Sequence, residues 1–87
     1  MQVREILAQN VKQIKKERGL TQFDLSELTG LSVREIGKIE RSQVSITLDT
    51  LQKLADGLGV TVIKMISEQY NVSRSELYQY YHELKER

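Results

Sequence analysis

The chain has 87 residues, a net charge of +1 at pH 7, a single histidine, and neither cysteine nor proline. This length supports one domain near the small end of what a single hydrophobic core can stabilise, and the lack of cysteine excludes disulfides and thiolate metal sites. An apolar fraction of 39% and a charged fraction of 29%, together with only five glycines, favour a compact helical protein.

Membrane, secretion and catalytic patterns are missing from the sequence. No apolar run approaches the roughly 20 residues that cross a bilayer, and the N-terminus lacks the pattern of a secretion signal. We therefore expect a cytoplasmic protein with no membrane partner. Because no Ser-His or Cys-His set, phosphate-binding glycine loop or metal cluster is present, we expect neither an enzyme nor a need for a metal or cofactor.

A first helix is expected near the N-terminus, because apolar residues recur there at three- and four-residue steps. Gly19 should end this helix. Residues 1–20 hold five cations and two acidic residues, a local charge of +3, whereas the rest of the chain sums to −2. Cations in a last helical turn offset the helix dipole, so this excess is typical of a solvated helix surface. The apolar residues of this helix are Val3, Ile6, Leu7, Val11 and Ile14.

A second helix is expected to begin after Thr21, because Thr21 and Asp24 match a capping box. It should carry Leu25 and Leu28 toward the core and end after about two turns at Gly30, a residue suited to a sharp turn.

Ser32 and Glu35 form another capping box, so a third helix should begin only two residues beyond that glycine. Its inward residues are Ile36 and Ile39, and residues 42–46 form the loop that follows. The side chains left for its outward side are Val33, Arg34, Lys38 and Arg41.

Thr47 should cap a fourth helix that ends at Gly59, and a short fifth helix should follow Thr61. The fourth helix has its apolar residues at helical spacing: Leu48, Leu51, Leu54, Ala55 and Leu58. A final helix is expected from Ser73, which forms a capping box with Glu76. The sequence thus predicts an all-α fold, with a five-helix domain at 1–66 and a helical extension at 67–87.

Two short helices joined by a tight glycine-containing turn, as in residues 21–41, have the layout of the helix-turn-helix unit that reads DNA. The chain holds an ordered combination of residues at fixed spacing: Gly19-Leu20-Thr21-Gln22, Leu25, Gly30-Leu31-Ser32, Ile36, Ile39-Glu40-Arg41, Leu51 and Leu54-Ala55. Through this combination, the chain resembles the phage repressor and Cro-like helix-turn-helix regulators over roughly residues 3–66. The resemblance implies a five-helix domain whose third helix enters the DNA major groove.

Three outward residues of the third helix are the candidates for reading bases. Arg34 can donate two hydrogen bonds to a guanine, Val33 can contact a thymine methyl group, and Lys38 can reach a base or a phosphate. Glu35 either serves its cap or accepts a hydrogen bond from a cytosine amino group.

The resemblance also implies contacts with the DNA backbone and one structural ion pair. Gln22, in the first turn of the second helix, should bind a phosphate, and Glu40 should pair with Lys15 of the first helix. The complete set expected at the DNA backbone is Gln22, Ser32, Arg41, Ser42, Gln43 and Ser45.

Four residues depart from the family pattern. Ser42 stands where the family commonly has glycine. Ser26 replaces a usual alanine, and we expect its hydroxyl to bond back to a carbonyl of the preceding turn. Phe23 takes a normally polar position, either as a lid over the first helix, which we favour, or as an exposed contact. Gly37 lies inside the third helix, where DNA or a neighbouring helix could come near.

The C-terminal extension holds four tyrosines and calls for a buried surface. Its helix either folds over its own domain or, as we favour, pairs with a second subunit. The expected dimer interface comprises Val62, Ile63, Ile66, Leu77, Tyr78, Tyr81 and Leu84.

From these observations we expect a sequence-specific transcription regulator that binds double-stranded DNA, acting as a homodimeric repressor on a palindromic operator. One alternative is an antitoxin that autoregulates its operon and binds a toxin. Another is a protein-interaction module that has lost DNA binding, which would fit the low net charge.

Overall fold

The computed structural model describes residues 2–68 and contains five helices, with no strand, in that range. The helices are α1 (Val3–Arg18), α2 (Gln22–Thr29), α3 (Val33–Glu40), α4 (Leu48–Leu58) and α5 (Val62–Ile66). The predicted all-α fold and the order of its five helices are confirmed, whereas the expected C-terminal helix lies outside the described residues.

Most helix ends lie where the local sequence indicates them. The Thr21, Ser32, Thr47 and Thr61 side chains cap the four later helices, as predicted. The helices α1, α2 and α4 end at the expected glycines. Since these signals lie within a few residues of each boundary, they are readable without knowledge of the tertiary structure.

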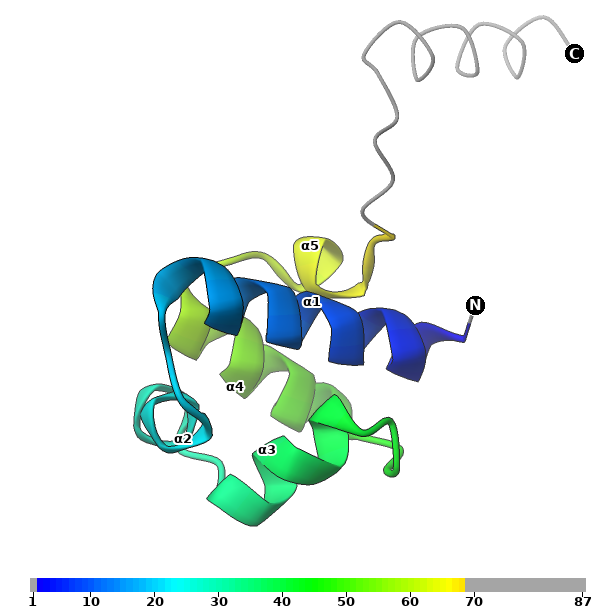
Figure 1. The fold of residues 1–87 in the computed structure, drawn as a ribbon. Helices are drawn as coiled ribbons and strands as arrows, with labels where there is room; N and C mark the ends of the chain where they lie inside the picture. The colour runs from blue at the N-terminus through cyan, green and yellow to red at the C-terminus, as the bar shows by residue number, and fades with distance from the viewer. Residues whose placement is uncertain (1, 69–87) are drawn as a thin grey trace, which may run out of the picture.

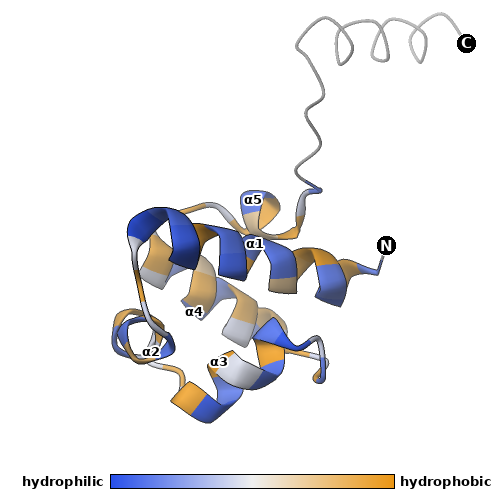
Figure 2. Ribbon diagram, viewed as in Figure 1, coloured by the Kyte–Doolittle hydropathy of each residue, from blue (hydrophilic) through white to orange (hydrophobic). Residues whose placement is uncertain are grey.

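One hydrophobic core joins all five helices. Each helix contributes a side chain with no exposed surface, and these residues are Val11, Leu25, Ile36, Leu54 and Met65. Figure 1 shows α2 and α3 together at one end of the molecule; α1 packs against α3 and α5, and α2 packs against α3 and α4. Figure 2 shows hydrophilic residues along the outer face of α1. Within residues 2–68, every helix is too short or too polar to span a bilayer.

The orientation of α2 differs from the expectation. Leu28, predicted to face the core, is 51% exposed, and Phe23, interpreted as a lid, is 61% exposed. The buried residues of α2 are instead Leu25 and Thr29. Thr29 is accommodated there because its hydroxyl donates to the Leu25 carbonyl at 2.7 Å and accepts from the Leu31 amide at 3.2 Å. The inward placement of Leu28 and the favoured lid interpretation of Phe23 were therefore wrong, and the exposure of Phe23 fits the other interpretation, an exposed contact.

Ser26 also differs from the expectation. Its hydroxyl donates forward to the carbonyl oxygen of Leu31, in the turn that follows α2, rather than back to the preceding turn. The hydrogen bond therefore stabilises the connection between α2 and α3 and leaves the α2 backbone ladder undisturbed.

Candidate nucleic-acid interface

The α2 and α3 helices are held as a tight pair by capping boxes and a left-handed turn. In the first box, the Asp24 amide donates to the Thr21 hydroxyl at 3.1 Å and the Thr21 amide donates to the Asp24 carboxylate at 2.9 Å. In the second, the Glu35 amide donates to the Ser32 hydroxyl at 3.0 Å. Gly30 between them has φ 79°, a conformation that a side chain would strain.

The Glu35 side chain takes part in the capping box at the start of α3. One of its carboxylate oxygens accepts from the Ser32 hydroxyl at 3.1 Å and from the Ser32 amide at 3.4 Å. This arrangement matches the capping interpretation of Glu35, because both contacts fix the first turn of α3.

The three candidate base-reading residues lie on α3 and outside the core. Ile36 and Ile39 face inward with 0% and 3% exposure. Arg34 is exposed, Val33 is 41% exposed, and Lys38 is half-buried and lines the groove beside α3. The helix is therefore anchored by one side and presents the other to solvent, which is the geometry that a groove-reading helix needs.

The residues expected at the DNA backbone lie at both ends of α3 and at the start of α2. Gln22 begins α2 and Ser32 caps α3. In the loop after α3, Ser42 adopts φ 56°, which explains why glycine is usual at this position in the resembling family. Gln43 and Ser45 are exposed beyond it.

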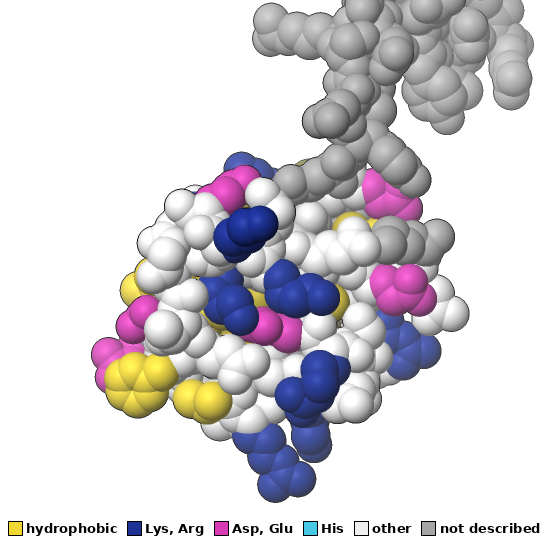
Figure 3. All heavy atoms as spheres, viewed as in Figure 1, with side chains coloured by type: hydrophobic (Ala, Val, Ile, Leu, Met, Phe, Trp, Pro, Cys, Tyr) yellow, Lys and Arg dark blue, Asp and Glu magenta, His cyan; other side chains and the backbone are white. Residues whose placement is uncertain are grey.

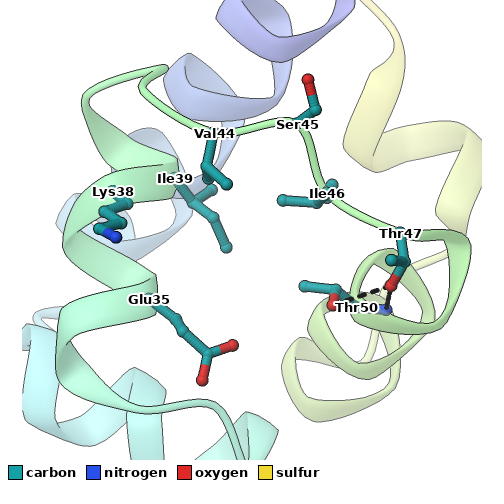
Figure 4. Close-up of a pocket in the computed structure, with 8 residues that line it drawn as sticks. All are labelled: Glu35, Lys38, Ile39, Val44, Ser45, Ile46, Thr47 and Thr50. Atoms are coloured by element: carbon teal, nitrogen blue, oxygen red, sulfur yellow. Dashed lines mark hydrogen bonds between the residues drawn. The ribbon is translucent and has the colours of Figure 1, made fainter.

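A groove of about 200 Å³ separates α3 from the start of α4. Figure 4 shows Ile39, Val44 and Ile46 pointing toward one another, with Glu35 extending from α3 toward the side of Thr50. Val44 and Ile46 are half-buried against the core. The apolar contacts of these two residues therefore tie the loop down and set where its polar residues project.

The predicted pair between Lys15 and Glu40 is present. The Lys15 Nζ lies 2.8 Å and 3.0 Å from the two carboxylate oxygens of Glu40. Because Lys15 belongs to α1 and Glu40 is the last residue of α3, the pair joins these helices. Figure 3 shows lysine and arginine side chains gathered over α1 and α3, with acidic groups between some of them and hydrophobic side chains at the edge over α2.

Two structurally important residues were missed at the sequence level. Asn10 is 4% exposed, and its Nδ2 donates to the carbonyls of Lys64, Met65 and Ser67 at 3.2, 2.7 and 3.0 Å. At Gly57 of α4, a Cβ would lie 2.5 Å from the Leu28 carbonyl oxygen. A polar residue on the apolar face of α1 and a glycine inside a helix were the available signals.

The residues expected at a dimer interface are only partly described. Ile63 is 75% exposed, and Val62 and Ile66 are half-buried. Ile66 also lines an apolar hollow of about 330 Å³, together with Val3 and Leu48. Val3 and Leu48, expected on buried helix faces, are 59% and 83% exposed and widen this apolar surface. The remaining interface candidates lie outside the described residues: Leu77, Tyr78, Tyr81 and Leu84.

The capped helices α2 and α3, with α3 anchored on the core, define a helix-turn-helix protein. The Helix-turn-helix (HTH_3) family model matches residues 11–64, and the chain belongs to this family. This confirms the resemblance to the phage repressor and Cro-like regulators. Within residues 2–68, no group of three His, Cys, Asp or Glu residues is placed to hold a metal.

Three known proteins illustrate the similarity. Control protein C.SmaI from Serratia marcescens is 39% identical over 69 residues, covering 79% of this chain and 82% of that protein. The immunity repressor protein of Bacillus phage phi105 is 38% identical over 63 residues, covering 72% of this chain and 44% of that protein. The crystal structure of the restriction-modification controller protein C.AhdI from Aeromonas hydrophila matches with a TM-score of 0.67 and 27% identity, covering 71% of this chain and 94% of that one.

Proposed function

We propose that this helix-turn-helix protein is a transcriptional repressor that binds a palindromic operator as a homodimer, with α3 in the major groove. The observation that carries the proposal is the placement of α3. Its inner side is buried, its start is doubly capped, and its end is tied to α1, while Arg34 and Val33 remain exposed. Such an anchored helix can present side chains to base edges without rearranging.

The small size of α3 favours the pairing of two copies of the chain. An eight-residue helix is about 12 Å long and can contact only a few base pairs. Two copies related by a two-fold axis would read half-sites about 34 Å apart, which increases the discrimination between the operator and other DNA sequences. The apolar hollow lined by Val3, Leu48 and Ile66 supports such pairing, because Val3 and Leu48 are exposed and large exposed apolar patches mark interaction sites.

The relatives support a regulatory role. Two of them, C.SmaI and C.AhdI, are called control or controller proteins, and the matched regions cover most of their lengths. The second candidate function is therefore control of restriction-modification genes by this chain. Recovery of a second protein bound to the natively purified chain would favour the antitoxin alternative instead.

A selection from a random-sequence double-stranded DNA library tests the proposal. We expect the chain to enrich one palindromic sequence, with an affinity that falls with salt at a logarithmic slope of about −0.9 per neutralised phosphate. Arg34→Ala should relax base preference at one position of each half-site, whereas Lys53→Ala, at an exposed position of α4, should leave every preference unchanged. Failure to enrich any sequence at low salt would contradict the proposal and favour an interaction module.

A further inference from the structure

The guanidinium of Arg41 lies folded back over Gly37, one helical turn earlier. A Cβ built on Gly37 would lie 3.0 Å from Nη1 of Arg41 and 3.7 Å from both Cζ and Nη2. These three atoms are the nearest neighbours of that position outside the backbone of α3, so the Arg41 guanidinium packs over the gap left by the glycine. Gly37 is buried.

This position brings Arg41 onto the outward side of α3. With 3.6 residues per turn, residues 34, 37, 38 and 41 share one face of a helix. We call Arg34, Gly37, Lys38 and Arg41 the outward stripe. A guanidinium that covers Gly37 lies along this stripe, between Arg34 and the end of the helix, rather than out in the loop.

Gln43 orients the same guanidinium. Its Oε1 accepts a hydrogen bond from Nε of Arg41 at 2.9 Å, and its own backbone amide donates to the Lys38 carbonyl at 3.0 Å. Nε is occupied, and among residues 2–68 no acceptor is bonded to Nη1 or Nη2, so their N–H groups remain for a ligand. Two parallel N–H donors match the N7 and O6 acceptors of guanine.

We propose that Arg41 reads a guanine in the major groove, and that Gly37 and Gln43 are positioning residues that set its guanidinium on the outward stripe. The inference rests on the proposed function and differs from the sequence-based expectation that Arg41 contacts the DNA backbone. The absence of a side chain at Gly37 has two effects. It makes room for the guanidinium, and it lets a base approach the helix backbone closely.

The test measures base preference position by position. The wild-type chain is first used to select a duplex from a random-sequence library, and binding is then measured to duplexes that carry single base-pair changes. Arg41→Lys keeps the charge but loses the paired donors. We expect it to lose about tenfold discrimination at one G·C pair per half-site, distinct from the pair affected by Arg34→Ala, with an unchanged salt slope.

The positioning residues have their own expected results. Gln43→Ala and Gly37→Ala should weaken preference at the same G·C pair while Arg41 is still present, which a purely structural role would not do. Arg4→Lys is the matched control, because the Nε of Arg4 donates to the Gln2 side chain at 3.1 Å just as that of Arg41 does to Gln43. It should change no preference.

Two results would overturn the inference in distinguishable ways. If Arg41→Lys keeps the wild-type preference at every position, or binds all duplexes equally more weakly, Arg41 contacts phosphate only and the proposed function stands. If the wild-type chain enriches no sequence, the proposed function fails, and this inference fails with it.

Discussion

Lys15 and Glu40 form a two-pronged ion pair across 25 residues of sequence, with Nζ 2.8 Å and 3.0 Å from the two carboxylate oxygens. The Glu40 side chain is 8% exposed and that of Lys15 is 25% exposed. The pair therefore lies at the boundary of the core, where water screens it less than a surface pair. It sets the end of α3 against α1 and so determines the angle at which the outward stripe is presented.

Removing one partner of this pair should cost stability. Lys15→Ala leaves a nearly buried carboxylate without its cation, and we expect the free energy of unfolding to fall by about 2 kcal/mol, between the values for exposed and buried pairs. Urea denaturation measures this change.

The neighbouring residue supplies the control for that prediction. Lys16→Ala, at an exposed position of α1, should change the free energy of unfolding by less than about 0.5 kcal/mol. The double variant Lys15→Met, Glu40→Leu should recover most of the loss, because no unpaired charge then remains. Equal losses in Lys15→Ala and Lys16→Ala would show that the pair contributes nothing beyond a surface contact.

The same glycine-to-alanine substitution should have opposite effects in two helices. At Gly57 a Cβ would meet backbone atoms of Leu28 and Thr29 at 2.5–2.9 Å, so we expect Gly57→Ala to destabilise the fold by about 2 kcal/mol. At Gly37 the nearest neighbours are atoms at the end of the flexible Arg41 side chain, which can move aside, so Gly37→Ala should stabilise the fold by up to about 1 kcal/mol. Thermal unfolding of both variants tests this contrast; a stabilised Gly57→Ala would contradict the close approach of α2 and α4.

Asn10 should be required for docking of α5. Its amide group serves three carbonyls at the end of that helix, and Asn10→Ala removes this donor from all three, of which the Lys64 carbonyl still accepts from the Ser67 amide at 3.4 Å. We expect a loss of about 2 kcal/mol in the free energy of unfolding. Asn10→Asp should be at least as harmful, because it points a carboxylate at carbonyl oxygens, whereas Gln13→Ala on the exposed side of α1 should be nearly neutral. A well-tolerated Asn10→Asp would mean that packing, not hydrogen bonding, holds α5.

The proposed homodimer makes Ile63 a sensitive position. Ile63→Glu places a charge on a residue that is 75% exposed, so the fold should be unaffected while an apolar interface is disrupted. We expect the mass in solution, measured by light scattering, to shift from dimer to monomer. Phe23→Glu, at a 61% exposed position on α2, is the matched control and should leave the dimer intact. An unchanged mass for Ile63→Glu would exclude α5 from the interface.

Features coded by neighbouring residues could be predicted from the sequence. The capping boxes at Thr21 and Ser32 and the turn at Gly30 depend on side chains within three residues of the backbone that they serve, so they identified the helix-turn-helix layout. The pair between Lys15 and Glu40 was found through the family resemblance, since no local rule connects residues so far apart.

Features that depend on how helices pack could not be predicted in the same way. In the eight-residue α2, helical spacing allowed Leu28 as an inward residue, but the packing places Thr29 there and leaves Leu28 half exposed. The approach of α4 to α2 at Gly57 and the contacts of Asn10 likewise exist only in the assembled structure. For Arg41, spacing indicated an outward position, but only coordinates show its guanidinium over Gly37.

Along α3, different residues keep the helix in place and face outward. Ser32, Ile36 and Glu40 supply the cap, the core contact and the ion pair, whereas Arg34 and Lys38 take part in none of these. Substitutions in the outward stripe can therefore accumulate without unfolding the protein. A duplicated gene could thus acquire a new target sequence in a few mutational steps, and two descendants sharing one scaffold could govern separate promoters in the same cell.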